Sequence, residues 1–175
     1  EFGNAHVAVL DSNASTAPGS PQYWFLDEDL AASAARWKFV AFHHSIYTVT
    51  PNTVIRASLV PLFDRHHVDI VFMGHVHGYE RTKPLLANHV VSSGEGTVYV
   101  TTGGGGRSVG SVGHTTFAAY SENAPHFTRV AVDDDLLLLQ MIRVNGSIGD
   151  SLTLMKGVAT VTTASSTTST VRVTT

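Results

Sequence analysis

Residues 1–73 alternate between short apolar runs and segments whose apolar residues recur at helical spacing. The runs at 7–10, 37–42 and 68–73 are rich in β-branched and aromatic residues, which is typical of buried strands. Between them, residues 53–67 carry apolar side chains three and four positions apart, and Ser20–Pro21 supplies a helix N-cap followed by a proline suited to the first turn. This alternation predicts βαβ units in a largely parallel sheet.

From residue 97 onward the pattern becomes strand-like throughout. The apolar or alternating segments are residues 97–102, 128–133, 136–144 and 151–155. Asn145–Gly146, between the last two, is typical of a hairpin turn. We therefore expect antiparallel strands in this half and a mixed α/β, or α+β, class for the whole chain.

Length and composition limit the class of protein. A chain of 175 residues allows one domain with its own core. The 11 Lys and Arg against 14 Asp and Glu give a formal charge of −3, and the absence of a basic cluster excludes a broadly basic nucleic-acid binder. No apolar stretch reaches the ~18–20 residues of a membrane helix, so we expect no membrane span. The chain has no cysteine, which excludes disulfides and thiolate metal sites.

Histidine is the unusual component, because 10 histidines nearly equal the 11 lysines and arginines. His43 and His75 each follow a predicted parallel strand, so both should lie at the edge of the sheet where ligands bind in α/β proteins. His75 and His77 are two residues apart, and an extended segment would point both rings to the same side. Three neutral imidazoles at this edge predict a transition-metal site.

The chain offers few carboxylates for such a site. A pair of metal ions for phosphoryl displacement carries four positive charges, which three imidazoles leave uncompensated. Asp11 is the only acidic residue that ends a predicted parallel strand, and an aspartate there more often caps a loop. Glu80 and Arg81 are interpreted as an ion pair that shapes their loop. His44 is interpreted either as a proton donor beside the site or as a solvent-facing loop residue.

A longer pattern around these histidines resembles a known family. It consists of V-A-F-H, ending at His43, and V-D-I-V-F-M-G-H-V-H-G-Y-E-R over residues 68–81. This pattern is similar to that of the calcineurin-like metallophosphoesterases, particularly their purple acid phosphatase branch, and the similarity extends over roughly residues 2–156. The resemblance implies two mixed β-sheets packed face to face with helices outside, and hydrolysis of phosphate esters by a metal-activated hydroxide.

The resemblance also implies roles for individual histidines. His43 and His75 would hold the second of two metal ions and His77 the first, with iron, zinc or manganese as the possible metals. His44 is the nearest substitute for the histidines that deliver protons in the purple branch. Ser45 stands where the family commonly has proline.

The family's other ligands come from upstream G-D-x, G-D-x-x-Y and G-N-H-[DE] segments, which this sequence lacks. We therefore interpret residues 1–156 as the C-terminal half of a metallophosphoesterase domain whose N-terminal half is missing. Residues 157–175, rich in serine and threonine, are interpreted as a linker or as a strand leading to a further domain. The expected partners are a phosphate-ester substrate and the missing half, with no nucleic acid.

The leading hypothesis is a secreted phosphoester hydrolase with a dinuclear metal centre, inactive as the 175-residue chain alone. Glycosylation acceptor patterns at residues 13–15 and 145–147 and the Ser/Thr-rich end favour an extracellular location. One alternative is a non-catalytic scaffold of the same fold in an extracellular or cell-surface assembly. Another is a mononuclear structural zinc site on the same three histidines. The choice among monoester, diester and nucleotide substrates stays open.

Overall fold

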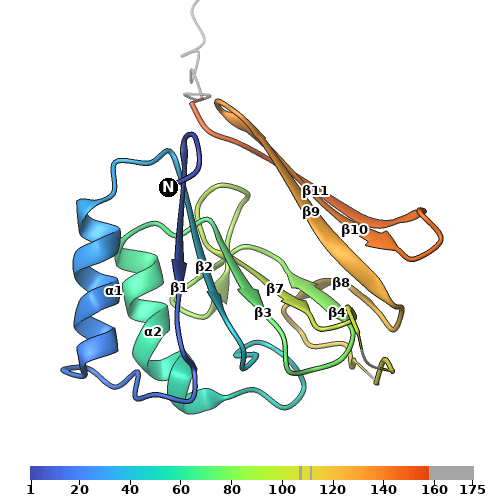
Figure 1. Cartoon of the computed structure of the whole chain (residues 1–175), viewed down its shortest axis with the longest axis horizontal. Coiled ribbons are helices and arrows are strands. Elements are labelled where there is room, and N and C mark those ends of the chain that lie inside the picture. The colour runs from blue at the N-terminus through green and yellow to red at the C-terminus, as the bar shows by residue number, and fades with distance from the viewer. Residues whose placement is uncertain (107, 111, 158–175) are drawn as a thin grey trace, which may run out of the picture.

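The computed structural model describes residues 1–106, 108–110 and 112–157. These residues form three layers, with two helices on one side of a central sheet and a smaller sheet on the other (Figure 1). The interpretation of residues 157–175 as a tail lies outside the described residues, apart from Gly157. No helix in the described part of the chain has both the length and the apolar character needed to cross a membrane.

The central sheet has six strands in the order β1-β2-β3-β7-β4-β8. They are β1 (Ala5–Val9), β2 (Trp37–Phe42), β3 (Ile70–Met73), β7 (Val98–Thr102), β4 (Tyr79–Thr82) and β8 (Ala118–Glu122). The first three strands run parallel to one another, which confirms the predicted βαβ units.

The antiparallel arrangement predicted for residues 97–102 is wrong in part. Strand β7 runs parallel to β3 and antiparallel to β4, so it joins the two kinds of pairing within one sheet. Its residues Val98, Tyr99 and Val100 are buried on both faces of the sheet, which suits a central strand rather than a half-exposed antiparallel one.

Both helices pack on one face of this sheet. Helix α1 (Pro21–Ala32) begins after the N-cap Ser20, and α2 (Thr53–Arg65) begins after the N-cap Asn52. Each cap side chain accepts a hydrogen bond from the backbone N–H three residues later, which satisfies a donor that the first helical turn leaves free. The apolar core on this side includes Leu26, Leu30, Val40, Leu59, Phe63, Val71 and Tyr99.

The second sheet is a three-stranded antiparallel meander of β9 (His126–Asp133), β10 (Leu136–Arg143) and β11 (Ile148–Met155). The predicted Asn145–Gly146 turn joins β10 to β11, and Gly146 has a φ of 83°, which favours glycine. A short hairpin of β5 (Leu85–Leu86) and β6 (His89–Val90) completes the fold.

The two sheets pack face to face, as the resemblance implied, and the mixed α/β class is confirmed. The core between them includes Trp37, Phe39, Ile70, Tyr79, Val98, Leu137, Leu139, Met141 and Leu154. Two details differ from the expectation: the smaller sheet is purely antiparallel rather than mixed, and among the described residues both helices cover the same face of the central sheet.

A buried ion pair joins the two sheets. Arg81 on β4 donates hydrogen bonds of 2.6 and 2.8 Å to the two carboxylate oxygens of Asp150 on β11, and the hydroxyl of Tyr79 donates to the same carboxylate at 2.8 Å. The predicted Glu80–Arg81 pair is therefore wrong. Successive side chains on a strand point to opposite faces, so Glu80 faces away from the second sheet and accepts a hydrogen bond from Thr115.

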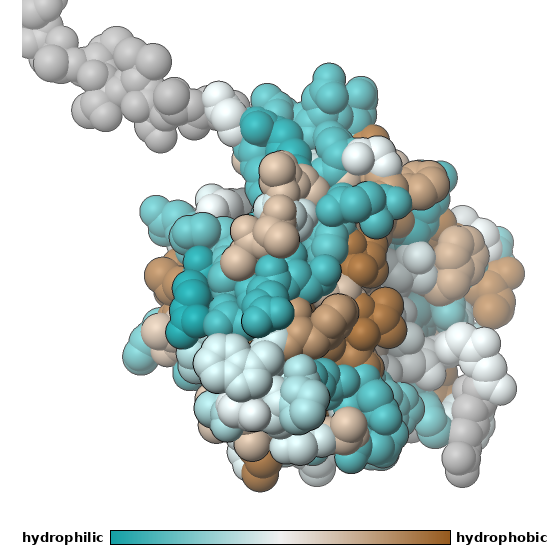
Figure 2. All heavy atoms as spheres, turned by 60° about the vertical axis from the view of Figure 1, so that its left-hand side comes forward, coloured by the Kyte–Doolittle hydropathy of each residue, from teal (hydrophilic) through white to brown (hydrophobic). Residues whose placement is uncertain are grey.

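Strand β1 forms one edge of the central sheet. It pairs with β2 alone among the described strands. Beyond Ala5, whose N–H and carbonyl are bonded to Phe2, its other side presents unpaired backbone groups. Val7 and Val9 on this strand are 46% and 70% exposed. Figure 2 shows the side of the molecule on which α1 lies, where hydrophobic atoms gather among hydrophilic ones in the middle of the view. The free backbone groups of β1 could therefore form hydrogen bonds with a further β-strand.

Candidate metal centre

Two loops at the carboxyl-terminal edge of the central sheet bring three imidazoles together. His43 and His44 directly follow β2, and His75 follows β3 after Gly74. The ring centroids of His43 and His44, and of His43 and His75, are 5.1 Å apart, and those of His44 and His75 are 5.0 Å apart. Nε2 of His43 lies 3.1 Å from Nδ1 of His75. The parallel pairing of β2 with β3 places both loops at one edge, as the sequence predicted.

The segment from His75 to His77 is not extended, contrary to expectation. His75 has a φ of 62°, in the left-handed region that non-glycine residues seldom occupy. The N–H of Val76 donates to the carbonyl of Gly74 at 2.7 Å, and the N–H of Gly78 donates to the carbonyl of Val76 at 3.0 Å. Two tight turns therefore replace the extended geometry that would have aligned the two rings.

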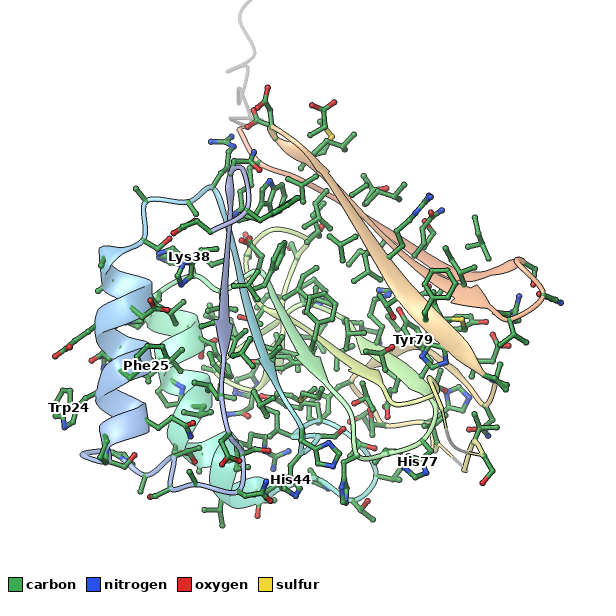
Figure 3. The ribbon with its side chains drawn as sticks, in the orientation of Figure 1. Trp24, Phe25, Lys38, His44, His77 and Tyr79 are labelled. Carbon is green, nitrogen blue, oxygen red and sulfur yellow. The ribbon has the colours of Figure 1, made fainter. Side chains whose placement is uncertain are left out.

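His77 lies at the same edge of the sheet but outside the close cluster. Figure 3 shows His44 and His77 at the lower edge of the sheet, separated from one another along it. Among the described residues, the close histidine ring pairs join His43, His44 and His75. The structure thus brings together two of the three predicted ligands and adds His44 to them.

The hydroxyl of Ser12 fixes the ring of His44. Its oxygen accepts a hydrogen bond from the backbone N–H of His44 at 3.1 Å and lies 2.8 Å from Nδ1 of the ring. When that hydroxyl donates to Nδ1, the neutral imidazole carries its hydrogen on Nε2. His44 is partly buried in this arrangement and is therefore not a fully solvent-facing residue. Its role as a proton donor stays a prediction.

The electrostatics of the cluster favour a neutral His43. Although His43 is largely exposed, desolvation of its imidazole, followed by the charges of His75, His44 and His77, lowers the pKa of this ring below its usual value. The neutral form is the one that binds metal ions. Desolvation and the neighbouring imidazoles therefore keep the His43 ring in the form that can bind a metal ion.

The His43–His75 contact fits two ligands of one metal ion. Nitrogens that each lie about 2.0–2.1 Å from an ion, at an angle of roughly 90–109°, are about 2.9–3.4 Å apart, and the observed separation is 3.1 Å. No group of three or more His, Asp or Glu side chains within the described ranges is arranged to hold a metal. The imidazole pair therefore fits part of a metal centre whose remaining ligands must come from elsewhere.

Asp11 does not supply the missing charge. Its Oδ1 accepts hydrogen bonds from the backbone N–H and the side-chain amide of Asn13 at 2.8 and 3.1 Å. These bonds, led by the backbone one, lower the pKa of Asp11. The carboxylate therefore caps its own loop, in agreement with the more common role of an aspartate at this position.

Ser12 and Ser45 are the polar contacts that sequence reasoning missed. Ser12 contacts His44 across 32 residues, and the hydroxyl of Ser45 donates to the carbonyl of Gly74 at 2.7 Å. For Ser45 the sequence held one signal, since a serine stands where the family pattern has proline.

Comparisons with known proteins indicate the family and the fold of this chain. The family model for calcineurin-like phosphoesterases matches residues 5–79. The chain is 28% identical over 181 residues to a nucleotide pyrophosphatase/phosphodiesterase of Hordeum vulgare, covering 88% of this chain and 49% of that protein. It is 35% identical over 130 residues to purple acid phosphatase 1 of Ipomoea batatas, covering 65% of this chain and 28% of that protein.

The structure of a purple acid phosphatase from yellow lupin (Lupinus luteus) superposes with a TM-score of 0.80 at 24% identity, covering 89% of this chain and 32% of that one, which supports the shared fold. The chain spans less than half the length of these relatives. The matched motifs and the fold together show that the chain belongs to the calcineurin-like phosphoesterase family, in its purple acid phosphatase branch.

Proposed function

We propose that this chain supplies part of the catalytic centre of a metal-dependent phosphoester hydrolase. The observation that carries the proposal is the 3.1 Å contact between His43 and His75 at the ligand-binding edge of the sheet. In the proposed centre these two residues hold one metal ion and His77 holds a second, with iron, zinc or manganese suited to the nitrogen donors. When bound, the two ions would supply an activated hydroxide and neutralise charge on the phosphoryl oxygens.

In this proposal His44 delivers a proton to the leaving group. An ester oxygen that departs from phosphorus leaves as a poor, negatively charged group unless it is protonated. In the tautomer in which the Ser12 hydroxyl donates to Nδ1 of His44, Nε2 carries the hydrogen, and the ring lies beside the imidazoles of His43 and His75. The proton donor and the metal ligands would therefore face the same substrate.

The remaining ligands would come from a complementary half of the same domain. Three imidazoles carry no negative charge, and Asp11 is bound within its own loop. The free edge of β1, with its exposed Val7 and Val9, offers a surface on which further strands could pair. We infer that the active unit combines this chain with that half and takes a phosphate ester as its substrate.

An extracellular location is part of the proposal. The acceptor residues Asn13 and Asn145 both lie in exposed loops, as glycan attachment requires. Glycosidase treatment of the protein secreted from a eukaryotic host would show a loss of mass if either asparagine carries a glycan.

Metal counting together with a hydrolysis assay tests the proposed function. The 175-residue chain and a protein carrying both halves of the domain would each be loaded with zinc, or with iron and manganese, and assayed on an aryl phosphate. We expect two bound ions and metal-dependent turnover with both halves present, and no turnover by the chain alone.

Each of the other possible outcomes would contradict part of this proposal. A single bound ion without turnover would support a structural zinc site. No bound ion and no turnover in the protein with both halves would support a non-catalytic scaffold. Enzyme-like turnover by the 175-residue chain would contradict the need for a complementary half.

Substituting His44 with glutamine should slow hydrolysis in a manner that depends on the leaving group. An alkyl phosphate needs a proton on its departing oxygen, so its kcat should fall by about 10²-fold or more, whereas an aryl phosphate with an acidic phenol should lose much less. His66→Gln is a matched control, because His66 contacts Asp27 rather than the cluster. Equal losses for the two substrates would contradict the role of His44 as proton donor.

A further inference from the structure

Ser45 connects three segments at the base of the histidine cluster. Its side chain is buried, with 3% of the residue exposed, and its hydroxyl donates to the carbonyl of Gly74 at 2.7 Å. Its oxygen also lies 3.0 Å from the hydroxyl oxygen of Thr101 on β7. Each hydroxyl has one hydrogen, so the hydrogen of Thr101 points to Ser45 while that of Ser45 points to Gly74. The loop after β2, the loop after β3 and strand β7 are joined through one side chain.

The peptide groups on either side of Gly74 form hydrogen bonds with residues of both histidine loops. The N–H of Gly74 donates to the carbonyl of His43 at 3.0 Å, and its carbonyl accepts from Ser45 and from the N–H of Val76. Both lone pairs of that carbonyl are therefore used. Because this carbonyl belongs to the peptide that enters His75, its orientation helps to set the unusual φ of 62° at His75.

We propose that Ser45 is a positioning residue that sets the spacing between His43 and His75, and with it the affinity of that pair for a metal ion. This inference rests on the proposed function of the cluster. Without the hydroxyl, the carbonyl of Gly74 loses one of its two donors, and the peptide leading into His75 is held from one side only. Proline, which the family commonly has at this position, carries no hydroxyl and can make neither bond.

Ser58 provides a matched control elsewhere in the fold. It is also buried, at 8% exposure, and its hydroxyl donates to a backbone carbonyl, that of Ile55, at 3.1 Å. Its oxygen likewise lies 2.9 Å from a threonine hydroxyl, that of Thr16. Ser58→Ala therefore removes the same kinds of hydrogen bond from α2 without touching the histidine loops.

Titration with Co²⁺, followed by its visible absorption, tests the inference in the protein carrying both halves. We expect Ser45→Ala to weaken Co²⁺ binding by about 10–100-fold, the usual effect of losing a group that orients a ligand, and Ser45→Thr to restore most of the affinity. Ser58→Ala should bind Co²⁺ as the unaltered protein does while showing a similar loss of thermal stability.

The outcomes separate this inference from the proposed function. If the unaltered protein fails to bind Co²⁺, or binds it equally well after His75→Ala, the proposed metal centre is wrong. If binding depends on His75 but Ser45→Ala leaves it unchanged, only the positioning role is overturned. Should Ser45→Ala fail to fold, Thr101→Val decides, because it removes the hydrogen bond that orients the Ser45 hydroxyl. A weaker affinity supports the role and an unchanged one overturns it.

Discussion

Replacing His75 with alanine should lower the metal affinity of the protein carrying both halves by more than about 100-fold and abolish its metal-dependent phosphoester hydrolysis. Loss of a group that only orients a ligand costs about 10–100-fold, and loss of the ligand itself should exceed that range. His75 also lies within 3.1 Å of the His43 nitrogen, so one substitution removes half of the observed donor pair. Elemental analysis of bound metal and kcat/KM on an aryl phosphate would measure the two effects.

His43→Ala should have the same effect, and the double variant should lose little more than either single one, since in the proposed centre the two side chains bind the same ion. His89→Ala serves as the control, because His89 is exposed on β6, away from the cluster. Turnover retained after either substitution in the cluster would contradict the assignment of these ligands.

Asp150→Asn should destabilise the folded chain by about 3–5 kcal/mol at neutral pH, because it leaves the guanidinium of Arg81 charged and partly buried without its partner. The amide is similar in size, so packing between the sheets changes little. The free energy of unfolding in urea would measure the effect. Glu122→Gln breaks a more exposed pair with Arg143 and should cost less than about 1 kcal/mol. Equal losses in the two variants would contradict a special role for the pair between the sheets.

The pH dependence of this difference follows from the pKa of Asp150. Burial alone would raise that pKa, but the hydrogen bonds and charge of Arg81, together with Tyr79, bring it below the ordinary 3.8. A lowered folded-state pKa means that the stabilisation is fully present above the unfolded value and is lost as the pH falls through the folded one. The difference in the free energy of unfolding between the unaltered protein and Asp150→Asn should therefore stay constant from neutral pH down to about 5. It should shrink as the pH falls below 3.8, the ordinary pKa of an aspartate.

The sequence predicts those parts of the fold whose causes are local. Ser20 and the proline after it mark the start of α1, the run at residues 37–42 matches β2, and Asn145–Gly146 marks a hairpin turn. Strand β4 escaped prediction because its sequence Y-E-R-T is highly polar. Arg81 on this strand is paired with Asp150, and one carboxylate oxygen of Glu80 accepts a hydrogen bond from Thr115. Both partners lie far away in the chain, and no local pattern reveals them.

The candidate site also has features that the sequence predicts and features that it does not. His43 and His75 could be brought together from the sequence, because each follows a parallel strand and such strands end at a common edge. The separation of His77 and the inclusion of His44 could not, since they depend on the turns around Val76 and on the contact between Ser12 and His44. Backbone turns of two or three residues thus decide which imidazoles lie close together.

The free edge of β1 also affects how the chain behaves when it is alone. Two copies could align their unpaired edges antiparallel and extend the sheet across a two-fold axis, which would pair the free backbone groups of β1. Such a pairing would compete with the complementary half for the same backbone groups. Self-association of the separate chain and its assembly with the complementary half would then be mutually exclusive. Self-association would therefore inhibit that assembly increasingly as the concentration of the chain rises.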